Sequence, residues 1–279
     1  MAQVGAISEA EYVHGYDATV LQSHLWRTVD NSCTYLLPYI RPSMKILDVG
    51  CGPGNLTCDI AQRVPNGSVT GIDVSEDVIG YARKIATERQ SSNVSFCTGN
   101  VFSMEFQDRQ FDMVHAHQVL QHVGDASRAL KEMRRVTKPG GIIAVRDVAY
   151  FLYWPECAEI ELFNELFFKI GRATGGIPGS GRMLRQIFRE AEFNENHVSV
   201  GAGTWCFASR NDLDFWCGMW KKRVLKSGFA ENALKLGFAS QQDLERISEA
   251  WGRFSSTKDA WFTVVHGEVI YKREDIHDN

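Results

Sequence analysis

The sequence lacks any apolar run long enough to cross a bilayer, and it does not begin with a basic stretch followed by an apolar one. We therefore expect no membrane span and no secretory signal. Cysteines are also sparse: there are 7, an odd number, and none forms a C-x-x-C pair. This pattern favours free thiols in a reducing compartment, so we expect a cytoplasmic protein.

An excess of positive charge is absent as well. The 30 Lys and Arg residues are outnumbered by 34 Asp and Glu, which gives a net charge of -4. Nucleic acids are bound by basic surfaces, so this balance disfavours a nucleic-acid partner. The remaining composition is ordinary for a globular protein, and 279 residues suit one large α/β domain that carries an insertion.

Strand-like and helix-like segments alternate from residue 45 to about 148, with short links between them. Such alternation predicts a parallel sheet with helices on both faces. The expected strands are 45–49, 68–73, 93–98, 111–116 and 142–146, and the expected helices end near 63, 89 and 136. Before this region, an apolar stripe predicts one helix over residues 18–40.

The pattern changes after Asp147. Helices are expected at 155–173 and 182–192, a sixth strand at 197–200, and a valine-rich last strand at 261–272. The stretch between the last two strands looks helical in several pieces, so we expect a helical cap over one end of the sheet.

A glycine-rich turn is the strongest local signal. It reads D-V-G-C-G-P-G over residues 48–54 and lies between an expected strand and an expected helix. Glycines let the backbone approach a ligand closely, and the helix N-terminus presents unpaired N–H groups to it. The dinucleotide fingerprint G-x-G-x-x-G would need a glycine where Asn55 stands, so a nicotinamide-dependent oxidoreductase is a less favoured alternative.

Three further residues follow the ends of expected strands, where parallel α/β folds bind ligands. Asp73 can accept both hydroxyls of a ribose, and its alternative role is a helix-cap contact. Asn100 can accept from and donate to a ligand, or it is a plain turn residue. His117 can orient a cofactor, contact an acceptor or act as a base, or it is a hydrogen-bonded residue that shapes its loop.

Together these features resemble class I S-adenosylmethionine (SAM)-dependent methyltransferases, in the branch of ubiquinone and menaquinone biosynthesis. The resemblance spans about 45–147 and implies a Rossmann-like, mostly parallel seven-stranded sheet with an antiparallel last strand. It implies SAM as the cofactor and S-adenosylhomocysteine as its product. The residues implied to bind it are Gly50, Cys51, Gly52, Asp73, Val74, Asn100, Val101 and His117.

An N-terminal element is similar to one that closes over the cofactor in relatives. The resemblance implies that Tyr16 holds the sulfonium by cation–π attraction and that Arg27 pairs with the cofactor carboxylate. Helix packing is the alternative for Tyr16, and a solvated charge is the alternative for Arg27. The expected organisation is a helical lid over 1–44, a SAM-binding core over 45–148, helices and the sixth strand over 149–208, the cap over 209–258, and the last strand with a tail over 259–279.

The predicted function is in-line transfer of a methyl group to a small, apolar or aromatic acceptor, with His117 as the candidate catalytic residue and no metal. Six of the 7 tryptophans follow Asp147, which suggests that the cap lends rings to the acceptor pocket. A nucleobase acceptor is disfavoured, since the motif (D/N)-P-P-(Y/F) is replaced by H-A-H-Q over 115–118. A SAM-binding regulatory or scaffold protein remains the alternative, and the composition is compatible with a homodimer.

Overall fold

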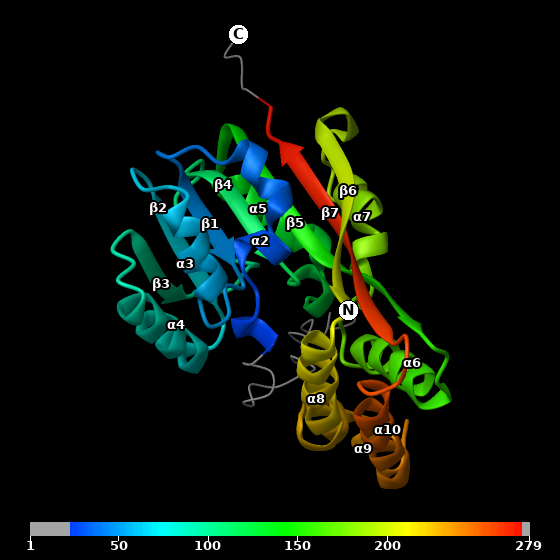
Figure 1. Ribbon diagram of the computed structural model, residues 1–279. Coiled ribbons are helices and arrows are strands. Elements are labelled where there is room, and N and C mark those ends of the chain that lie inside the picture. The colour runs from blue at the N-terminus through cyan, green and yellow to red at the C-terminus, as the bar shows by residue number, and fades with distance from the viewer. Residues whose placement is uncertain (1–22, 275–279) are drawn as a thin grey trace, which may run out of the picture.

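One seven-stranded sheet runs through the computed structural model, which describes residues 23–274 (Figure 1). The strand order is β3-β2-β1-β4-β5-β7-β6, and β7 runs antiparallel to both of its neighbours while all other pairs are parallel. The predicted mostly parallel sheet with an antiparallel last strand is confirmed. The strands are β1 Lys45–Val49, β2 Ser68–Asp73, β3 Val94–Thr98, β4 Phe111–His117, β5 Thr137–Trp154, β6 Val198–Phe207 and β7 Trp261–Lys272.

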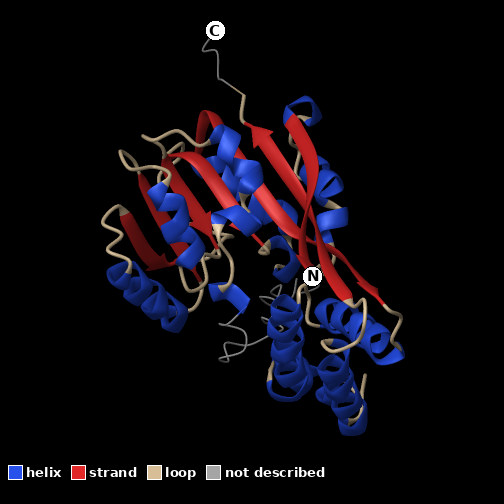
Figure 2. Cartoon of the chain, viewed as in Figure 1, coloured by secondary structure: helices blue, strands red, loops and turns tan. Residues whose placement is uncertain are grey.

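Helices cover both faces of the parallel part, because successive strand residues point to opposite sides of a sheet (Figure 2). Ile46 packs on the face that α3 covers, and its neighbour Leu47 packs on the face of α5 and α7. Ser75 caps the helix after β2 by accepting from Val78 N–H, as the sequence suggested. These helices are α3 Asn55–Gln62, α4 Glu76–Glu88, α5 Ala126–Val136 and α7 Leu184–Glu190.

The predicted single helix over residues 18–40 is wrong. The described part of this range holds helical residues 23–25, the short helix α2 Val29–Ser32 and the 3-10 helix η1 Thr34–Tyr39. Thr28 begins a new helix through a reciprocal capping box with Asn31, and Pro38 cannot continue an α-helical hydrogen-bond ladder. Residues 18–22 lie outside the described range.

Two strands are longer than predicted. β5 was expected over 142–146 and runs to Trp154, and β6 was expected over 197–200 and runs to Phe207. Both extensions pair with β7, so the antiparallel part of the sheet continues beyond the parallel core. Apolar residues on both faces hide the alternation there: Phe151 points into a core, whereas Tyr150 and Leu152 on the other side are exposed. The predicted boundary at residue 148 therefore falls inside a strand.

Three helices lie between β6 and β7: α8 Arg210–Lys226, α9 Gly228–Lys235 and α10 Gln241–Phe254. With α6 Ala158–Ala173 they gather at one end of the sheet, at the bottom of Figure 1. They enclose their own core, whose larger members are Phe151, Phe163, Phe167, Trp205, Phe207, Trp216, Trp220, Phe229, Trp251, Phe254 and Phe262. Among the described residues, most of the aromatic rings of this half therefore pack against one another.

The sequence also led to expectations about membrane spans and about the cysteines. None of its helices is long and apolar enough to span a membrane. Each of the 7 cysteines is a free thiol, and most are buried.

Candidate functional site

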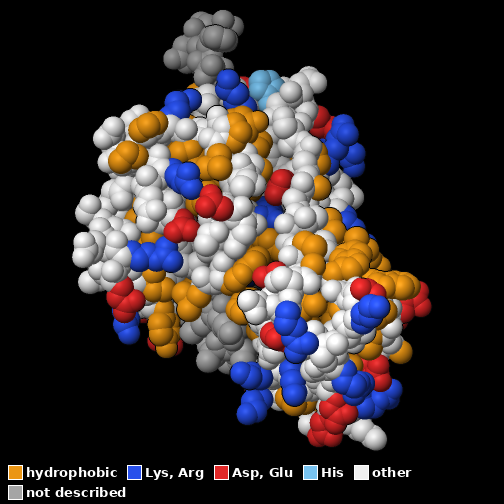
Figure 3. All heavy atoms as spheres, in the orientation of Figure 1, with side chains coloured by type: hydrophobic (Ala, Val, Ile, Leu, Met, Phe, Trp, Pro, Cys, Tyr) orange, Lys and Arg blue, Asp and Glu red, His pale blue; other side chains and the backbone are white. Residues whose placement is uncertain are grey.

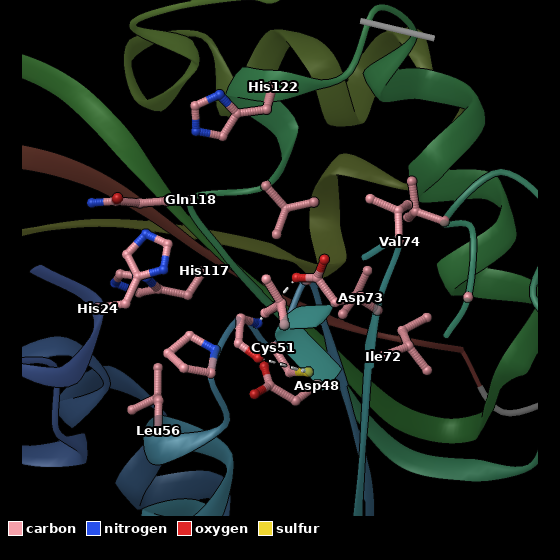
Figure 4. A pocket seen from close by; sticks show the side chains of 18 of the residues that line it. His24, Asp48, Cys51, Leu56, Ile72, Asp73, Val74, His117, Gln118 and His122 are labelled. Atoms are coloured by element: carbon pink, nitrogen blue, oxygen red, sulfur yellow. Dashed lines mark hydrogen bonds between the residues drawn. The ribbon is translucent and has the colours of Figure 1, made fainter. Parts of the chain in front are cut away.

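A cavity opens at the carboxyl ends of β1, β2 and β4, the edge at which the predicted residues were expected to meet (Figure 4). Every predicted cofactor residue that the structure describes lines it: Arg27, Gly50, Cys51, Gly52, Asp73, Val74, Asn100, Val101 and His117. Tyr16 lies outside the described residues. The residues predicted from five separate segments of the chain therefore line one cavity.

The glycine turn forms the floor of this cavity. Gly50, Gly52 and Gly54 all have positive φ values, of 65°, 56° and 81°. A Cβ on Gly50 would come 2.5 Å from the Val119 side chain, and one on Gly52 would come 3.3 Å from His24 Nδ1. Glycine is therefore required both by the backbone conformation and by the close approach of the opposite wall.

Asp73 stands at the end of β2 and turns its carboxylate toward this turn. Its oxygens accept from Gly52 N–H at 3.1 Å and from Ser75 N–H at 3.2 Å. Burial raises the pKa of Asp73, against the effect of these backbone donors. A carboxylate has about four lone-pair sites, so it can hold the turn and the helix end and still accept from a ligand. The cap contact and the ribose role are compatible.

Asn100 follows β3 and forms a turn at the rim. Its side-chain oxygen accepts from Phe102 N–H at 2.8 Å, which matches the alternative of a turn asparagine. An amide oxygen has two lone pairs and the amide nitrogen is a donor, so this side chain can serve more than one partner. Val101 is buried beside it, while Val74 on the adjacent loop is 66% exposed and lies at the mouth of the cavity.

His117 ends β4 and is 5% exposed, yet neither ring nitrogen has a hydrogen-bond partner within residues 23–274. Burial, and then the nearby Arg27 and Arg146, hold the pKa of His117 well below its usual range. The ring is therefore neutral at pH 7 and offers one donor and one acceptor. A lowered pKa makes a weak base, so the environment favours hydrogen bonding over proton abstraction. Its face stacks on Trp205, with ring centroids 5.8 Å apart.

Arg27 enters from the N-terminal side. Its guanidinium donates to Gln118 Oε1 at 2.9 Å and lies over the Trp205 ring, 5.5 Å from the centroid. Its backbone carbonyl accepts from Asn55 at the start of α3. Arg27 is thus partly buried and hydrogen-bonded, and it is not the solvated helix charge that was the alternative prediction.

The structure adds five polar residues that sequence reasoning did not place in the site, of which Asp48 and Asn55 belong to the glycine turn and the start of α3. His24, Gln118 and His122 line the same cavity, and Figure 4 shows them on the side of His117, away from Asp73. Burial, followed by Arg27, lowers the pKa of His122 to about 3, so its ring is neutral. The only sequence signal was nearness to residues already singled out.

Asp48, the aspartate of the glycine motif, is buried beneath the turn. It accepts from Thr57 Oγ1 at 2.6 Å and lies 2.8 Å from His115 Nδ1. Burial works against a charge on His115, but Cys33 and Asp48 prevail and raise its pKa to about 10. The resulting buried ion pair fixes β1, β4 and α3 to one another beneath the cavity.

Comparison with known proteins agrees with this arrangement. A methyltransferase-domain family model matches residues 40–201. An uncharacterised methyltransferase of Schizosaccharomyces pombe is 33% identical over 273 residues, covering 95% of this chain and 97% of its own. A demethylmenaquinone methyltransferase of Listeria monocytogenes is 32% identical over 182 residues, covering 58% of this chain and 74% of its own.

Solved structures extend the likeness to the fold. A phosphoethanolamine N-methyltransferase of Haemonchus contortus, crystallised with S-adenosylhomocysteine, superposes with a TM-score of 0.54 at 15% identity, over 86% of this chain and 51% of that one. The predicted Rossmann-like fold of class I methyltransferases is confirmed. This chain belongs to the methyltransferase-domain family and is a methyltransferase.

Proposed function

We propose that the protein transfers the methyl group of SAM to a small, uncharged, largely apolar acceptor. The observation that carries the proposal is the cavity itself, in which a glycine turn at positive φ faces a buried histidine whose two ring nitrogens have no hydrogen-bond partner within residues 23–274. Buried polar groups are normally paired, so such a histidine marks a place where a ligand completes the site.

The lining fits SAM from one end to the other. Asp73 would accept the ribose hydroxyls, while Asn100 and Val101 would meet the adenine and Val74 would cover it at the mouth. The backbone of Gly50, Cys51 and Gly52 would pass along the amino-acid part. Arg27 would pair with the carboxylate, and the proposal keeps Tyr16 as the contact of the sulfonium.

Bound SAM supplies an electrophilic methyl group on a sulfonium, so the chain has only to bind, align and exclude water. The apolar side chains of Leu56, Val119 and Val123 line the cavity and keep water out. His117, neutral and without a hydrogen-bond partner within residues 23–274, would hold the acceptor or the amino-acid part by a hydrogen bond. Alignment for in-line displacement can supply about 7–11 kcal/mol of a barrier, so no base is required for a good nucleophile.

The charges of the cavity bear on the acceptor. Arg27 is the one Lys or Arg among the described residues that line it, and it is assigned to the cofactor carboxylate. With that guanidinium assigned, the described lining offers a phosphorylated acceptor no second guanidinium or ammonium group, which supports a neutral one. We further propose that the segment over 1–44 acts as a lid and that the helices over 209–258 cap the acceptor side.

Incubation with methyl-labelled SAM and a panel of quinols, phenols and enols tests this function. We expect label in at least one apolar acceptor, none in DNA or RNA, and micromolar SAM affinity by calorimetry with far weaker NADH binding. Tight SAM binding with no transfer to any compound would favour the alternative of a SAM-binding regulatory or scaffold protein.

A further inference from the structure

Trp205 lies near the end of β6 and belongs to the aromatic core of the cap, where it is 5% exposed. Its indole N–H donates to the backbone carbonyl of Asn31 at 2.8 Å. The rings of Trp26 and Trp205 meet edge to face, with their centroids 5.2 Å apart. The indole is therefore fixed both by the core of the cap and by the N-terminal segment.

The same ring contacts two side chains of the cavity wall. The guanidinium carbon of Arg27 lies over it, 5.5 Å from the centroid, and the His117 imidazole stacks on it at 5.8 Å. It also meets His266 edge to face at 4.5 Å, and Nε2 of His266 lies 2.9 Å from the amide nitrogen of Gln118. Arg27 and His117 line the cavity, whereas Trp205 is not among the described residues that line it. An effect of Trp205 on a ligand would therefore pass through its neighbours.

The guanidinium of Arg27 has contacts of at least two kinds at this wall. It donates to Gln118 Oε1 at 2.9 Å, and it lies over the indole. The attraction of a cation to an aromatic face is directed at the charge and requires no particular N–H group. The ring can therefore restrain Arg27 and still leave its N–H groups to a carboxylate, which a guanidinium binds through two parallel hydrogen bonds.

Trp205 also brings two like charges together. Arg146 lies over the same ring, with its guanidinium carbon 5.5 Å from the centroid, the separation found for Arg27. The face of an indole carries negative potential, and its attraction for a cation is strongest where water is excluded. Arg146 is buried and donates to the carbonyl of Ser32, whereas Arg27 is only partly buried. Loss of negative potential on the ring would therefore release Arg27 more readily than Arg146.

We infer that Trp205 is a positioning residue, whose indole face holds the guanidinium of Arg27 in place for the carboxylate of the cofactor's amino-acid part. The inference rests on the proposed function, which assigns that carboxylate to Arg27. Trp205 acts without touching the ligand. A less electron-rich ring should reduce affinity only for ligands that carry the amino-acid part, because the nucleoside part is assigned to Asp73 and Asn100.

Fluorinated tryptophans at position 205 test this contact while keeping the ring and its N–H group. Each added fluorine withdraws electron density from the indole face and weakens the cation–π attraction. From tryptophan to tetrafluorotryptophan, we expect affinity for S-adenosylhomocysteine to fall stepwise by about threefold in calorimetry. Affinity for 5′-methylthioadenosine, which lacks the amino-acid part, should not change.

Two controls isolate the pair of Trp205 and Arg27. The same fluorinated residues at position 216 should change neither affinity, since Trp216 is also 5% exposed in the cap core and packs on Trp205 and Phe207. Arg27→Leu should weaken S-adenosylhomocysteine and spare 5′-methylthioadenosine. In the Arg27→Leu protein, fluorination at position 205 should have no further effect on either nucleoside.

The outcomes separate this inference from the function beneath it. If Arg27→Leu weakens S-adenosylhomocysteine selectively but fluorination at position 205 does not, the role of Trp205 is overturned and the proposed function stands. Equal weakening of both nucleosides by fluorination would show that the ring only supports the fold. Failure of the unaltered protein to bind either nucleoside would overturn the proposed function, and the role of Trp205 with it.

Discussion

Asp73 makes two backbone contacts of its own while facing the proposed ribose, so its removal should affect binding more than folding. We expect Asp73→Ala to lower SAM affinity at least about tenfold, because charged hydrogen bonds contribute roughly 1.5–3 kcal/mol each. Calorimetry measures this, with Asp77→Ala on exposed α4 surface as the charge-matched control. An unchanged affinity in a folded Asp73→Ala protein would show that Asp73 does not bind the cofactor and only supports the backbone at Gly52 and Ser75.

His117 should not titrate near neutral pH. Because its pKa is depressed, the ring is already neutral at pH 6, and kcat/KM should show no rise between pH 6 and 8 that depends on it. His117→Asn keeps a donor and an acceptor and should retain activity within about tenfold, whereas His117→Leu should lose more. A pH–rate profile with a limb near 6.5 that vanishes in His117→Asn would show that this residue acts as a base after all.

The site residues whose identity is set by backbone conformation were the easiest to predict from sequence. The glycine turn and Asp73 follow from the need for close approach at a strand end, which one sequence displays directly. Gln118 and His266 could not be found this way. They are 148 positions apart in sequence, and their contact depends on the pairing of β5 with β7.

At the level of elements, the N-terminal segment is tied to three parts of the fold. Ser23 accepts from Arg223 of α8 at 2.9 Å, Arg27 donates to Gln118, and Asn31 O accepts from Trp205 of β6 at 2.8 Å. We expect hydrogen exchange at residues 23–28 to slow when S-adenosylhomocysteine binds, since the ligand adds a partner for this segment. Mass spectrometry of peptic peptides measures it. Equal exchange with and without ligand would mean that the segment is a fixed wall.

Asp147 joins β5 to the 3-10 helix η3 Ser180–Arg182, where Ser180 Oγ donates to it at 2.9 Å. Burial raises the pKa of Asp147 to about 7, above the value near 4 of the unfolded chain. Below pH 4 both states are protonated, and the folded state bears no cost. Between about pH 4 and 7 the unfolded chain is ionised while the folded carboxyl stays protonated, so stability falls across this window and levels off above pH 7.

Asp147→Asn should therefore be more stable than the unaltered protein at pH 8 and should lose that advantage by pH 4.5. The difference should approach at most about 4 kcal/mol, from roughly 1.4 kcal/mol per unit of pKa shift. Urea unfolding at the two pH values gives the comparison, and other titrating groups cancel between the proteins. Parallel stability curves would contradict the raised pKa.

The elements themselves were predicted unevenly. In the parallel core, the strands are short apolar runs and the helices carry one apolar face. The predicted ends of these strands and helices lie within a few residues of the observed ones. The N-terminal helix failed because a cap at Thr28 interrupts an otherwise continuous apolar stripe. The extensions of β5 and β6 failed because apolar side chains there face both a core and solvent, which removes the alternation that identifies a strand.

Two of the hydrophobic cores of the described residues, the core beneath α5 and the aromatic core of the cap, are joined by shared strands. Val145 of β5 belongs to the core beneath α5, whereas Phe151 of the same strand belongs to the aromatic core of the cap. β7 is divided likewise, between Val269 and Val264. A strand that holds both interiors transmits the loss of either one to the other.

We therefore expect a single thermal transition in calorimetry, with equal calorimetric and van't Hoff enthalpies. Trp251→Ala, which empties a fully buried site in the cap, should cost about 3–5 kcal/mol and lower the midpoint of that one transition. Two resolved transitions, with only one of them shifted, would show that the cap unfolds by itself.

Under the proposed role of the cap on the acceptor side, this sharing of strands also limits how the enzyme can change its acceptor. The interior of the cap is completed by Phe151, Trp205 and Phe262, which stand on the strands and not on the inserted helices. Helices transplanted from a relative at residues 209 and 258 would meet rings shaped for another partner. New acceptors would thus arise through paired substitutions in strands and helices, and a useful chimera would carry the distal ends of β5, β6 and β7 together with the cap.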